Sequence, residues 1–174
     1  SVQFVEAANI TNDGETIYYE GKVKKGDAKL LKKMLEETFI QHINLDSAGG
    51  HALEGFELGL AFREYNLTAT VDEGNRCMSA CATALLGAPE KIIDGPVGFH
   101  VAWSSGRGTL SDGMKQGQQF SVLESLYLFK LGYGLYFQYI VSTFTDADTM
   151  LLLDEEDLLL FKFEDAEDYA RDAN

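Results

Sequence analysis

Segments with the spacing of β-strands alternate with segments with the spacing of α-helices along most of this chain. The strand-like segments, which are short and rich in β-branched or aromatic residues, are residues 16–24, 40–46, 67–73 and 91–103, the last of which gives two short strands about the Gly95-Pro96 turn. The helix-like segments, which repeat apolar or small residues at helical intervals, are residues 27–39, 51–66, 75–87, 119–143 and 154–161. Such alternation is typical of α/β proteins whose strands are largely parallel. We therefore predict an α/β fold.

A single domain is the simplest organisation for a chain of 174 residues. The chain has no Pro-rich or Ser-rich linker, and it contains only two prolines. We predict one domain over residues 1–174, ending in an acidic segment at residues 146–174. Asp27 is the expected N-cap of the first helix. Four glycines within residues 104–118 predict a mobile loop before the long helix at residues 119–143.

Acidic residues outnumber basic ones by 28 to 14, which gives a net charge of −14. Eleven of the acidic residues lie in residues 146–174, against only Lys162 and Arg171, and we interpret this segment as solvated surface. Repulsion by phosphate groups argues against nucleic acid and anionic lipid as partners. The longest charge-free apolar stretch, residues 131–145, is shorter than the ~18 residues of a spanning helix, so we expect no membrane span.

Three local features have residue types that could serve one catalytic site. Ser47 is followed by Gly49 and Gly50 at the end of a strand segment, where glycines let backbone N–H groups turn outward toward an anion. Ser79 lies near the start of a small-residue helix, where free N–H groups favour negative charge. His100 ends a strand, and histidine is the usual base for a serine hydroxyl. Taken singly, each is more simply explained as a tight turn, a serine bonded to its own helix, or a core histidine.

Taken together, these features resemble the Clp-protease-like serine peptidase group. They are S-A-G-G at residues 47–50, C-M-S-A-C at residues 77–81, and a G-P…G-F-H strand pair ending at His100. The group includes the Clp proteolytic subunit, signal peptide peptidase A and ClpP-like proteins predicted to be periplasmic. The ClpP-like proteins predicted to be periplasmic resemble this chain most, because a cysteine pair flanking the serine is familiar in them. The resemblance spans roughly residues 16–103, and residues 154–161 more loosely. It implies a crotonase-like spiral of repeated ββα units and assembly into homo-oligomers.

The resemblance also implies a role for each matching residue. Ser79 matches the nucleophile and His100 the general base. Gly50, with Gly49 beside it, matches the turn of the oxyanion hole, and the N–H of Ala80 matches the second donor. Ser79 would attack a peptide carbonyl, His100 would take its proton, and the two N–H groups would bind the oxyanion. No cofactor or metal is expected.

The catalytic acid and one turn residue depart from the group's pattern. Ala48 stands where the group has the proline of S-P-G-G. Asp148 is our first choice for the acid, with Asp146 as the alternative. A Ser–His dyad would need no acid. A Ser–Lys dyad, as in signal peptide peptidase A, would need a lysine, and the nearest in sequence, Lys91, is expected at a strand edge.

The two cysteines, Cys77 and Cys81, are spaced one helical turn apart, with Ser79 facing another way. Two cysteines do not complete a tetrahedral zinc site, and redox pairs usually have C-x-x-C spacing. We interpret them as small packing residues of the helix, with a disulfide in an oxidising compartment as the less favoured alternative. His42 and His51 are expected to be structural or exposed.

The leading hypothesis is a ClpP-like serine peptidase that acts on peptides or unfolded proteins. Because the chain has no P-loop, folded substrates would need a separate ATPase or adaptor partner. A catalytically inactive ClpP-like oligomeric scaffold is one alternative, motivated by the unassigned acid, the acidic end and the aromatic helix at residues 119–143. A crotonase-type acyl-CoA enzyme is less favoured, because it would need a carboxylate base and no Ser–His pair. The resemblance favours a periplasmic or secreted location and leaves a cytoplasmic one open.

Overall fold

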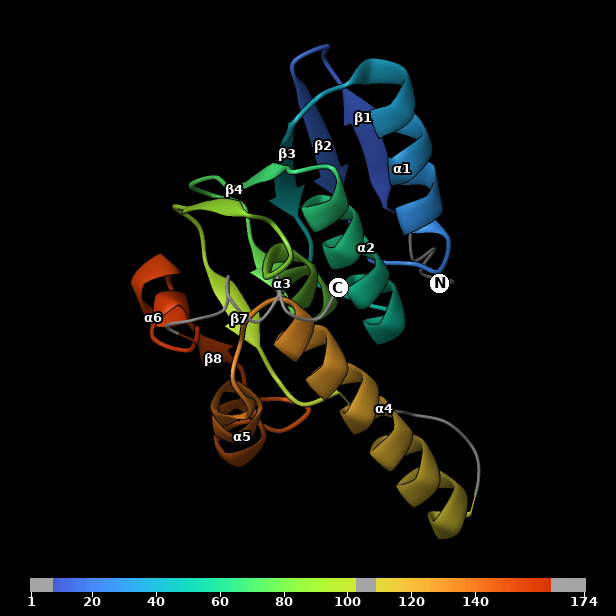
Figure 1. Cartoon of the computed structure of the whole chain (residues 1–174), viewed down its shortest axis with the longest axis vertical. Helices are drawn as coiled ribbons and strands as arrows, with labels where there is room; N and C mark the ends of the chain where they lie inside the picture. The colour runs from blue at the N-terminus through green and yellow to red at the C-terminus, as the bar shows by residue number, and fades with distance from the viewer. Residues whose placement is uncertain (1–7, 103–108, 164–174) are drawn as a thin grey trace, which may run out of the picture. The chain divides into compact units, whose positions relative to one another are not determined.

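The computed structural model describes residues 8–102 and 109–163 (Figure 1). Its strands are β1 (Asn9–Asn12), β2 (Thr16–Glu20), β3 (His42–Asp46), β4 (Thr68–Val71), β5 (Cys77–Met78), β6 (Glu90–Ile93), β7 (Val97–Phe99) and β8 (Leu151–Leu152). Its helices are α1 (Asp27–Thr38), α2 (Ala52–Glu64), α3 (Ala80–Leu85), α4 (Leu110–Lys130), α5 (Leu135–Phe144) and α6 (Glu155–Leu159). The chain forms two compact units. The first consists of Ser1–Phe99 with Leu152–Glu155, and the second of His100–Leu151 with Glu156–Asn174.

A five-stranded sheet in the order β1-β2-β3-β4-β6 forms the centre of the first unit. Strands β2, β3, β4 and β6 are parallel, whereas β1 pairs with β2 as an antiparallel hairpin. In β3 the consecutive residues Ile43, Asn44 and Leu45 are all buried, as in a strand covered on both faces. The prediction of an α/β fold with largely parallel strands is confirmed. Strand β1 was not predicted.

Helices α1 and α2 lie side by side along this sheet (Figure 1). Asp27 is the first residue of α1 and not its N-cap, a position that Gly26 takes. The buried Asp27 carboxylate instead accepts hydrogen bonds from the Tyr19 hydroxyl at 2.6 Å and the Lys24 N–H at 2.7 Å. Burial and the neighbouring Asp27 carboxylate raise the pKa of Tyr19 far above its usual value, so the hydroxyl stays protonated and donates. This contact fixes the start of α1 on β2.

Helix α3 packs closely on α2 because two glycines leave room for its backbone. A Cβ on Gly55 would lie 2.6 Å from the carbonyl oxygen of Ala80, and a Cβ on Gly87 would collide with the backbone of Gly59. Real Cβ atoms do not come this close to neighbouring backbone, so neither position can carry a side chain without a shift of the backbone. The close packing therefore holds α3, with Ser79 at its start, against α2.

A second, three-stranded sheet has the order β5-β7-β8. Strand β5 is parallel to β7, with Cys77 opposite Val97. The residue after β3, Ser47, forms a parallel bridge with Cys77. The end of β3 is therefore tied directly to the strand that precedes Ser79. The two predicted strands around the Gly95-Pro96 turn are confirmed as β6 and β7.

The helix predicted over residues 75–87 is wrong in its first half. Cys77 and Met78 are a strand, Ser79 is the N-cap, and the helix covers only Ala80–Leu85. The small residues on both sides of Ser79 suit a helix, but the hydrogen bonds of Cys77 and Ser79 go to Pro96 and Gly98 of the β7 segment. Tertiary pairing therefore overrides the local helical pattern.

The second unit contains α4 and α5, which pack against each other. The mobile loop predicted at residues 104–118 is wrong from Leu110 onward, where α4 begins. The Thr109 hydroxyl accepts the Asp112 N–H, and the Asp112 carboxylate accepts the Thr109 N–H, which together form a capping box. The earlier part of that segment lies largely outside the described residues.

The long helix predicted over residues 119–143 is two helices. Helix α4 ends in a Schellman motif, in which Gly132 N–H bonds to Phe129 and Tyr133 N–H bonds to Leu128. Gly132 has a φ of 82°, which the motif requires. Helix α5 follows from Leu135.

The predicted terminal helix is present as α6. In the described part of the chain, no helix has the length and apolar character to cross a membrane.

Candidate active site

Ser79 connects β5 to α3 with an unusual backbone conformation. Its φ is 55° and its ψ is −121°, a combination that side chains other than glycine rarely adopt and that costs on the order of 1–3 kcal/mol. Such sharp strand-to-helix turns place a serine side chain at the surface of many hydrolases. Ser79 is half-buried, so solvent reaches it.

The backbone of Ser79 is held on both sides of its Cα. Its N–H donates to the carbonyl of Gly98 at 2.7 Å. Its carbonyl accepts the N–H of Thr83 at 2.9 Å and the Thr83 hydroxyl at 3.2 Å. These bonds oppose relaxation of the strained dihedral angles. His100 follows Gly98 by two residues in the chain.

The Gly49-Gly50 turn lies directly against Ser79. A Cβ on Gly49 would be 2.5 Å from the carbonyl oxygen of Met78, 2.7 Å from the Cβ of Ser79 and 3.1 Å from the nitrogen of Ala80. Gly49 also has a φ of 88°. Both the space and the dihedral angle therefore exclude a side chain there. The first unit thus brings the predicted glycine turn, the predicted nucleophile and the predicted second donor together.

The N–H groups of the two glycines have different surroundings. The Gly49 N–H donates to the hydroxyl of buried Ser47 at 3.0 Å, so it is already used. Gly50 forms a parallel bridge with Val23 through the flanking groups: Val23 N–H donates to Gly49, and His51 N–H donates to Val23. The Gly50 N–H takes no part in that bridge. The Ala80 N–H, in the first position of α3, has no carbonyl within its helix to bond.

The contacts of Ser47 and Val23 with Gly49 were not predicted from the sequence. Ser47 also bonds through its backbone, because its N–H donates to Arg76 and its carbonyl accepts the Met78 N–H at 2.9 Å. It therefore links the glycine turn to the strand before Ser79. The S-A-G-G motif indicates the turn, but nothing in it shows that the serine hydroxyl faces back onto Gly49.

His51 and Glu54 hold the other side of the glycine turn. His51 is the N-cap of α2, and its Nδ1 accepts the Glu54 N–H at 3.2 Å. The buried Glu54 carboxylate accepts the N–H of Ala28 at 2.8 Å, which ties the starts of α1 and α2 together. His51 is thus structural and exposed, and His42 is exposed on β3.

The two cysteines form a disulfide, with Cα atoms 5.2 Å apart. The interpretation as unbonded packing residues of one helix is therefore wrong. Cys77 lies in β5 and Cys81 in α3, so the bond joins a strand to a helix across the turn at Ser79. Both cysteines are nevertheless buried, as packing residues are.

His100 lies in the second unit, beside the chain segment that precedes β8. Its Nδ1 is 3.3 Å from the backbone carbonyl oxygen of Asp146. The next residue, Val101, donates its N–H to the Thr145 hydroxyl at 3.0 Å. An Nδ1–H bonded to a carbonyl leaves Nε2 as the basic nitrogen of the ring.

The carboxylate of Asp146 is occupied within its own turn. Its Oδ1 accepts the N–H groups of Asp148 and Thr149 and the Thr149 hydroxyl, at 2.8 to 2.9 Å. These bonds, led by the Thr149 hydroxyl, lower the pKa of Asp146 below its usual value. Asp148 is exposed in the same turn. Which of the two carboxylates acts as the acid stays a prediction.

Lys91 lies in β6, an edge strand of the five-stranded sheet, as predicted. Its ammonium group donates to the carbonyl of Ala88. Within residues 8–102 and 109–163, no three His, Cys, Asp or Glu side chains are grouped so that they could hold a metal ion.

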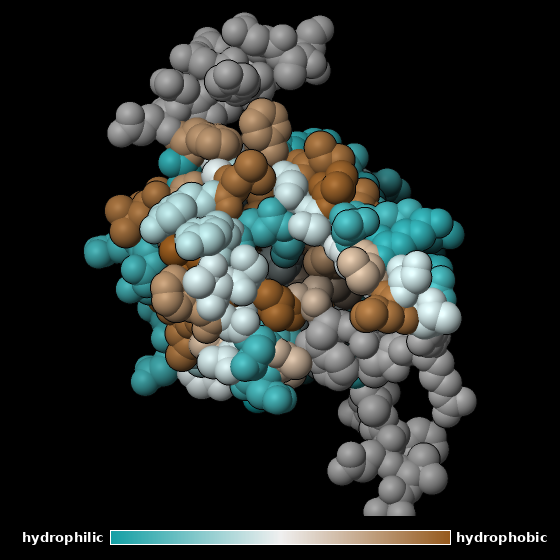
Figure 2. Space-filling view, turned by 90° about the horizontal axis from the view of Figure 1, so that it is seen from below, coloured by the Kyte–Doolittle hydropathy of each residue, from teal (hydrophilic) through white to brown (hydrophobic). Residues whose placement is uncertain are grey.

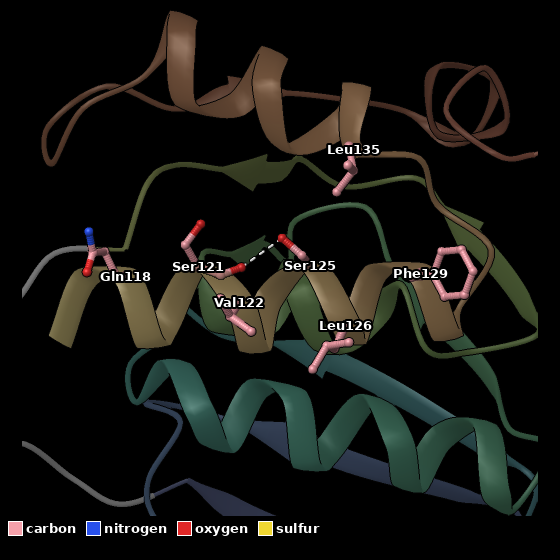
Figure 3. Close-up of a pocket in the computed structure, with 7 residues that line it drawn as sticks. All are labelled: Gln118, Ser121, Val122, Ser125, Leu126, Phe129 and Leu135. Carbon is pink, nitrogen blue, oxygen red and sulfur yellow. Dashed lines mark hydrogen bonds between the residues drawn. The ribbon is translucent and has the colours of Figure 1, made fainter. Parts of the chain in front are cut away.

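The second unit also carries an open groove of about 650 Å³ that none of the predicted site residues line (Figure 3). It is formed by Gln118, Ser121, Val122, Ser125, Leu126 and Phe129 of α4 and by Leu135 of α5. Beside it, Gln138 of α5 donates to the Glu124 carboxylate at 2.7 Å and accepts the Ser125 hydroxyl. Burial raises the pKa of Glu124 despite the bond from Gln138. These bonds attach α5 to α4.

Comparison with known proteins identifies the fold. No protein-family model and no curated protein matches the sequence. Among solved structures, a mutant of ClpP1 from Listeria monocytogenes matches with a TM-score of 0.56 and 18% identity, over 88% of this chain and 95% of that one. The fold is ClpP-like. At this identity the likeness shows the fold alone, and the spiral of repeated ββα units stays a prediction.

Replacing Ser47 with alanine tests its contact with the glycine turn. The Ser47→Ala protein loses the acceptor of the buried Gly49 N–H, and an unsatisfied buried donor costs on the order of 1–3 kcal/mol. We expect exchange of the Gly49 amide hydrogen, followed by NMR, to accelerate about tenfold or more. The Leu45 amide in β3 serves as the internal control. Unchanged protection at Gly49 would show that the hydroxyl does not hold the turn.

Proposed function

We propose that this chain is a ClpP-like serine peptidase with Ser79 as nucleophile and His100 as general base. The observation that carries the proposal is the position of Gly49 against Ser79 and Ala80. It sets a glycine turn, a serine in a strained strand-to-helix turn and a helix-start N–H side by side. These are the parts that acyl transfer through a serine requires. The ClpP-like fold supports the same chemistry.

In the proposed reaction, the Ser79 hydroxyl attacks the carbonyl carbon of a peptide bond, and His100 Nε2 accepts its proton. The oxyanion that forms is bound by the N–H groups of Gly50 and Ala80. Gly49 contributes the close approach, because its own N–H is bonded to Ser47. The protonated His100 then gives its proton to the leaving amine. Water hydrolyses the acyl-enzyme by the same steps in reverse order.

The orientation of His100 has two proposed sources. The Asp146 backbone carbonyl lies at its Nδ1, so a Ser–His pair oriented by a backbone oxygen needs no carboxylate. Asp148 remains our preferred acid, because the Asp146 carboxylate is occupied by three hydrogen bonds within its turn. A carboxylate partner would stabilise the imidazolium formed in the reaction.

The proposed substrates are peptides and unfolded proteins. A folded substrate would need a separate ATPase or adaptor to unfold it, because this sequence has no P-loop. Efficient cleavage of a stably folded protein without such a partner would contradict this assignment.

The periplasmic or secreted location also stays a proposal. The Cys77–Cys81 disulfide supports it, since disulfides persist in oxidising compartments.

Labelling with a fluorophosphonate, read by intact-mass spectrometry, tests the nucleophile. We expect one adduct on the wild-type protein and none on Ser79→Ala. His100→Ala should slow labelling by on the order of 10²–10⁴, the usual contribution of a general base. Ser142→Ala and His42→Ala are matched controls, because both residues are exposed, and both variants should label at the wild-type rate. Wild-type protein that stays unlabelled would favour the inactive scaffold.

Two conservative variants test the acid. Asp148→Asn should slow labelling by up to about 10²–10⁴-fold, the usual contribution of the base, if its carboxylate stabilises the His100 imidazolium. Asp146→Asn keeps an Oδ1 acceptor for the turn and the same backbone carbonyl, so it should label at the wild-type rate. Equal rates for both variants and the wild type would contradict a role for Asp148 and support the Ser–His pair with the backbone oxygen.

We also propose that the chain assembles into homo-oligomers through α4. Leu110, Met114, Val122, Leu126 and Phe129 are all more than half exposed on this helix. Figure 2 shows hydrophobic residues at the surface of one face of the molecule. Exposed apolar surface of this kind is typical of protein interfaces. A ClpP-like fold fits such assembly.

Sedimentation velocity tests the assembly. Leu126→Glu places a charge among the exposed apolar side chains of α4 and should convert the wild-type oligomer to monomer. Gln116→Glu, which adds the same charge at an exposed polar position of α4, is the control and should leave the oligomer intact. A monomeric wild-type protein would contradict the proposal.

A further inference from the structure

We propose that the Cys77–Cys81 disulfide is a positioning element for Ser79, so that the reactivity of this serine depends on the oxidation state of the cysteines. The dependence of Ser79 reactivity on the disulfide rests on the proposed function. The restraint of the Ser79 backbone by the disulfide does not. The bond closes a loop of five residues with Ser79 at its centre. The residues two before and two after the proposed nucleophile are therefore joined covalently.

The elements that the bond joins are too short to fix this geometry by themselves. Strand β5 has two residues and α3 has six, whereas isolated helices shorter than about 12 residues are marginal in water. Between them, Ser79 holds a φ of 55°, which a residue with a Cβ leaves readily unless its surroundings prevent it. The hydrogen bonds from Ser79 to Gly98 and from Thr83 to Ser79 resist this change, and the disulfide restrains the same segment.

The ends of the bond are anchored in different parts of the first unit. Cys77 pairs with Val97 in β7 and donates its N–H to Pro96. Cys81 lies in α3, which is packed against α2 through Gly55. The bond therefore connects the β5-β7-β8 sheet to the α2–α3 pair at the point where Ser79 passes between them. Losing it lets α3 shift relative to β5, and this would move Ser79 and the Ala80 N–H away from Gly49.

Reduction is a two-electron exchange with a dithiol. One thiolate of the dithiol attacks a cysteine sulfur and forms a mixed disulfide, and the other cysteine leaves as a thiolate that takes up a proton. The second thiol of the dithiol then releases the remaining cysteine as a thiol and closes its own disulfide. The products are the two thiols of Cys77 and Cys81 and one oxidised dithiol. Both cysteines are buried, so the attack requires local opening of this segment.

The test compares oxidised, dithiothreitol-reduced and re-oxidised wild-type protein, with thiols counted by alkylation and mass spectrometry. Reduced wild type keeps both sulfur atoms, so it reports the loss of the bond without a cavity. We expect reduction to slow fluorophosphonate labelling of Ser79 about 10–100-fold, since small displacements in an active site have effects of this size. Re-oxidation should restore the rate. The Cys77→Ala/Cys81→Ala protein should be labelled at the rate of the reduced protein. It provides a protein without the bond if dithiothreitol does not reduce the buried disulfide.

Amide hydrogen exchange separates the two proposals. The Thr83 N–H, which donates to the Ser79 carbonyl, should exchange faster in the reduced protein and in the double variant, whereas Leu45 in β3 should not change. If no form of the protein is labelled, the proposed function fails, and the exchange rate at Thr83 still decides the structural part. Equal labelling and equal Thr83 exchange with and without the bond would overturn the positioning role.

Discussion

The contact between Gly49 and the Ser79–Ala80 backbone is the constraint on which the candidate site depends. Position 49 requires glycine for two reasons. A Cβ there would collide with Met78 and Ser79, and its φ of 88° is one that other residues rarely adopt. The neighbouring bonds maintain it: Ser47 holds the Gly49 N–H, and Val23 holds the Gly49 carbonyl. Site geometry is thus set by backbone packing between segments far apart in the sequence. Two side-chain contacts, the Ser47 hydroxyl on the Gly49 N–H and the Cys77–Cys81 disulfide, support this packing.

Much of the first unit could be predicted from the sequence. The alternation of strand-like and helix-like segments indicated the parallel sheet, and the S-A-G-G motif indicated the turn at Gly49 and Gly50. The junction at Ser79 could not be predicted, because small residues on both sides of it favour a helix. Pairing of β5 with β7 decides its conformation, and such long-range pairing leaves no periodic signal in a two-residue strand. The same error made the disulfide the less favoured alternative, since both cysteines were placed on one helix.

The second unit was harder to predict for local reasons. Glycines at 113 and 117 indicated a loop, yet the capping box of Thr109 and Asp112 starts a helix before them. One long helix was predicted over residues 119–143, but the Schellman motif at Gly132 ends the first of two helices. The bond between His100 and the Asp146 carbonyl could not be predicted either, because a backbone acceptor has no sequence signature. Sequence motifs therefore indicate candidate catalytic side chains more readily than the backbone groups that contact them.

The hydrogen bonds around Ser79 have a consequence for biosynthesis. The N–H of Ser79 bonds to Gly98, and the N–H of Cys77 bonds to Pro96, so the acceptors lie later in the chain than the donors. A nascent chain that ends between these positions contains the serine but not the carbonyls that hold it. Domains fold as their chains emerge from the ribosome. The strained backbone of Ser79 is therefore held in place only after β7 has been translated, so this junction forms later than the β2–β3–β4 part of the sheet.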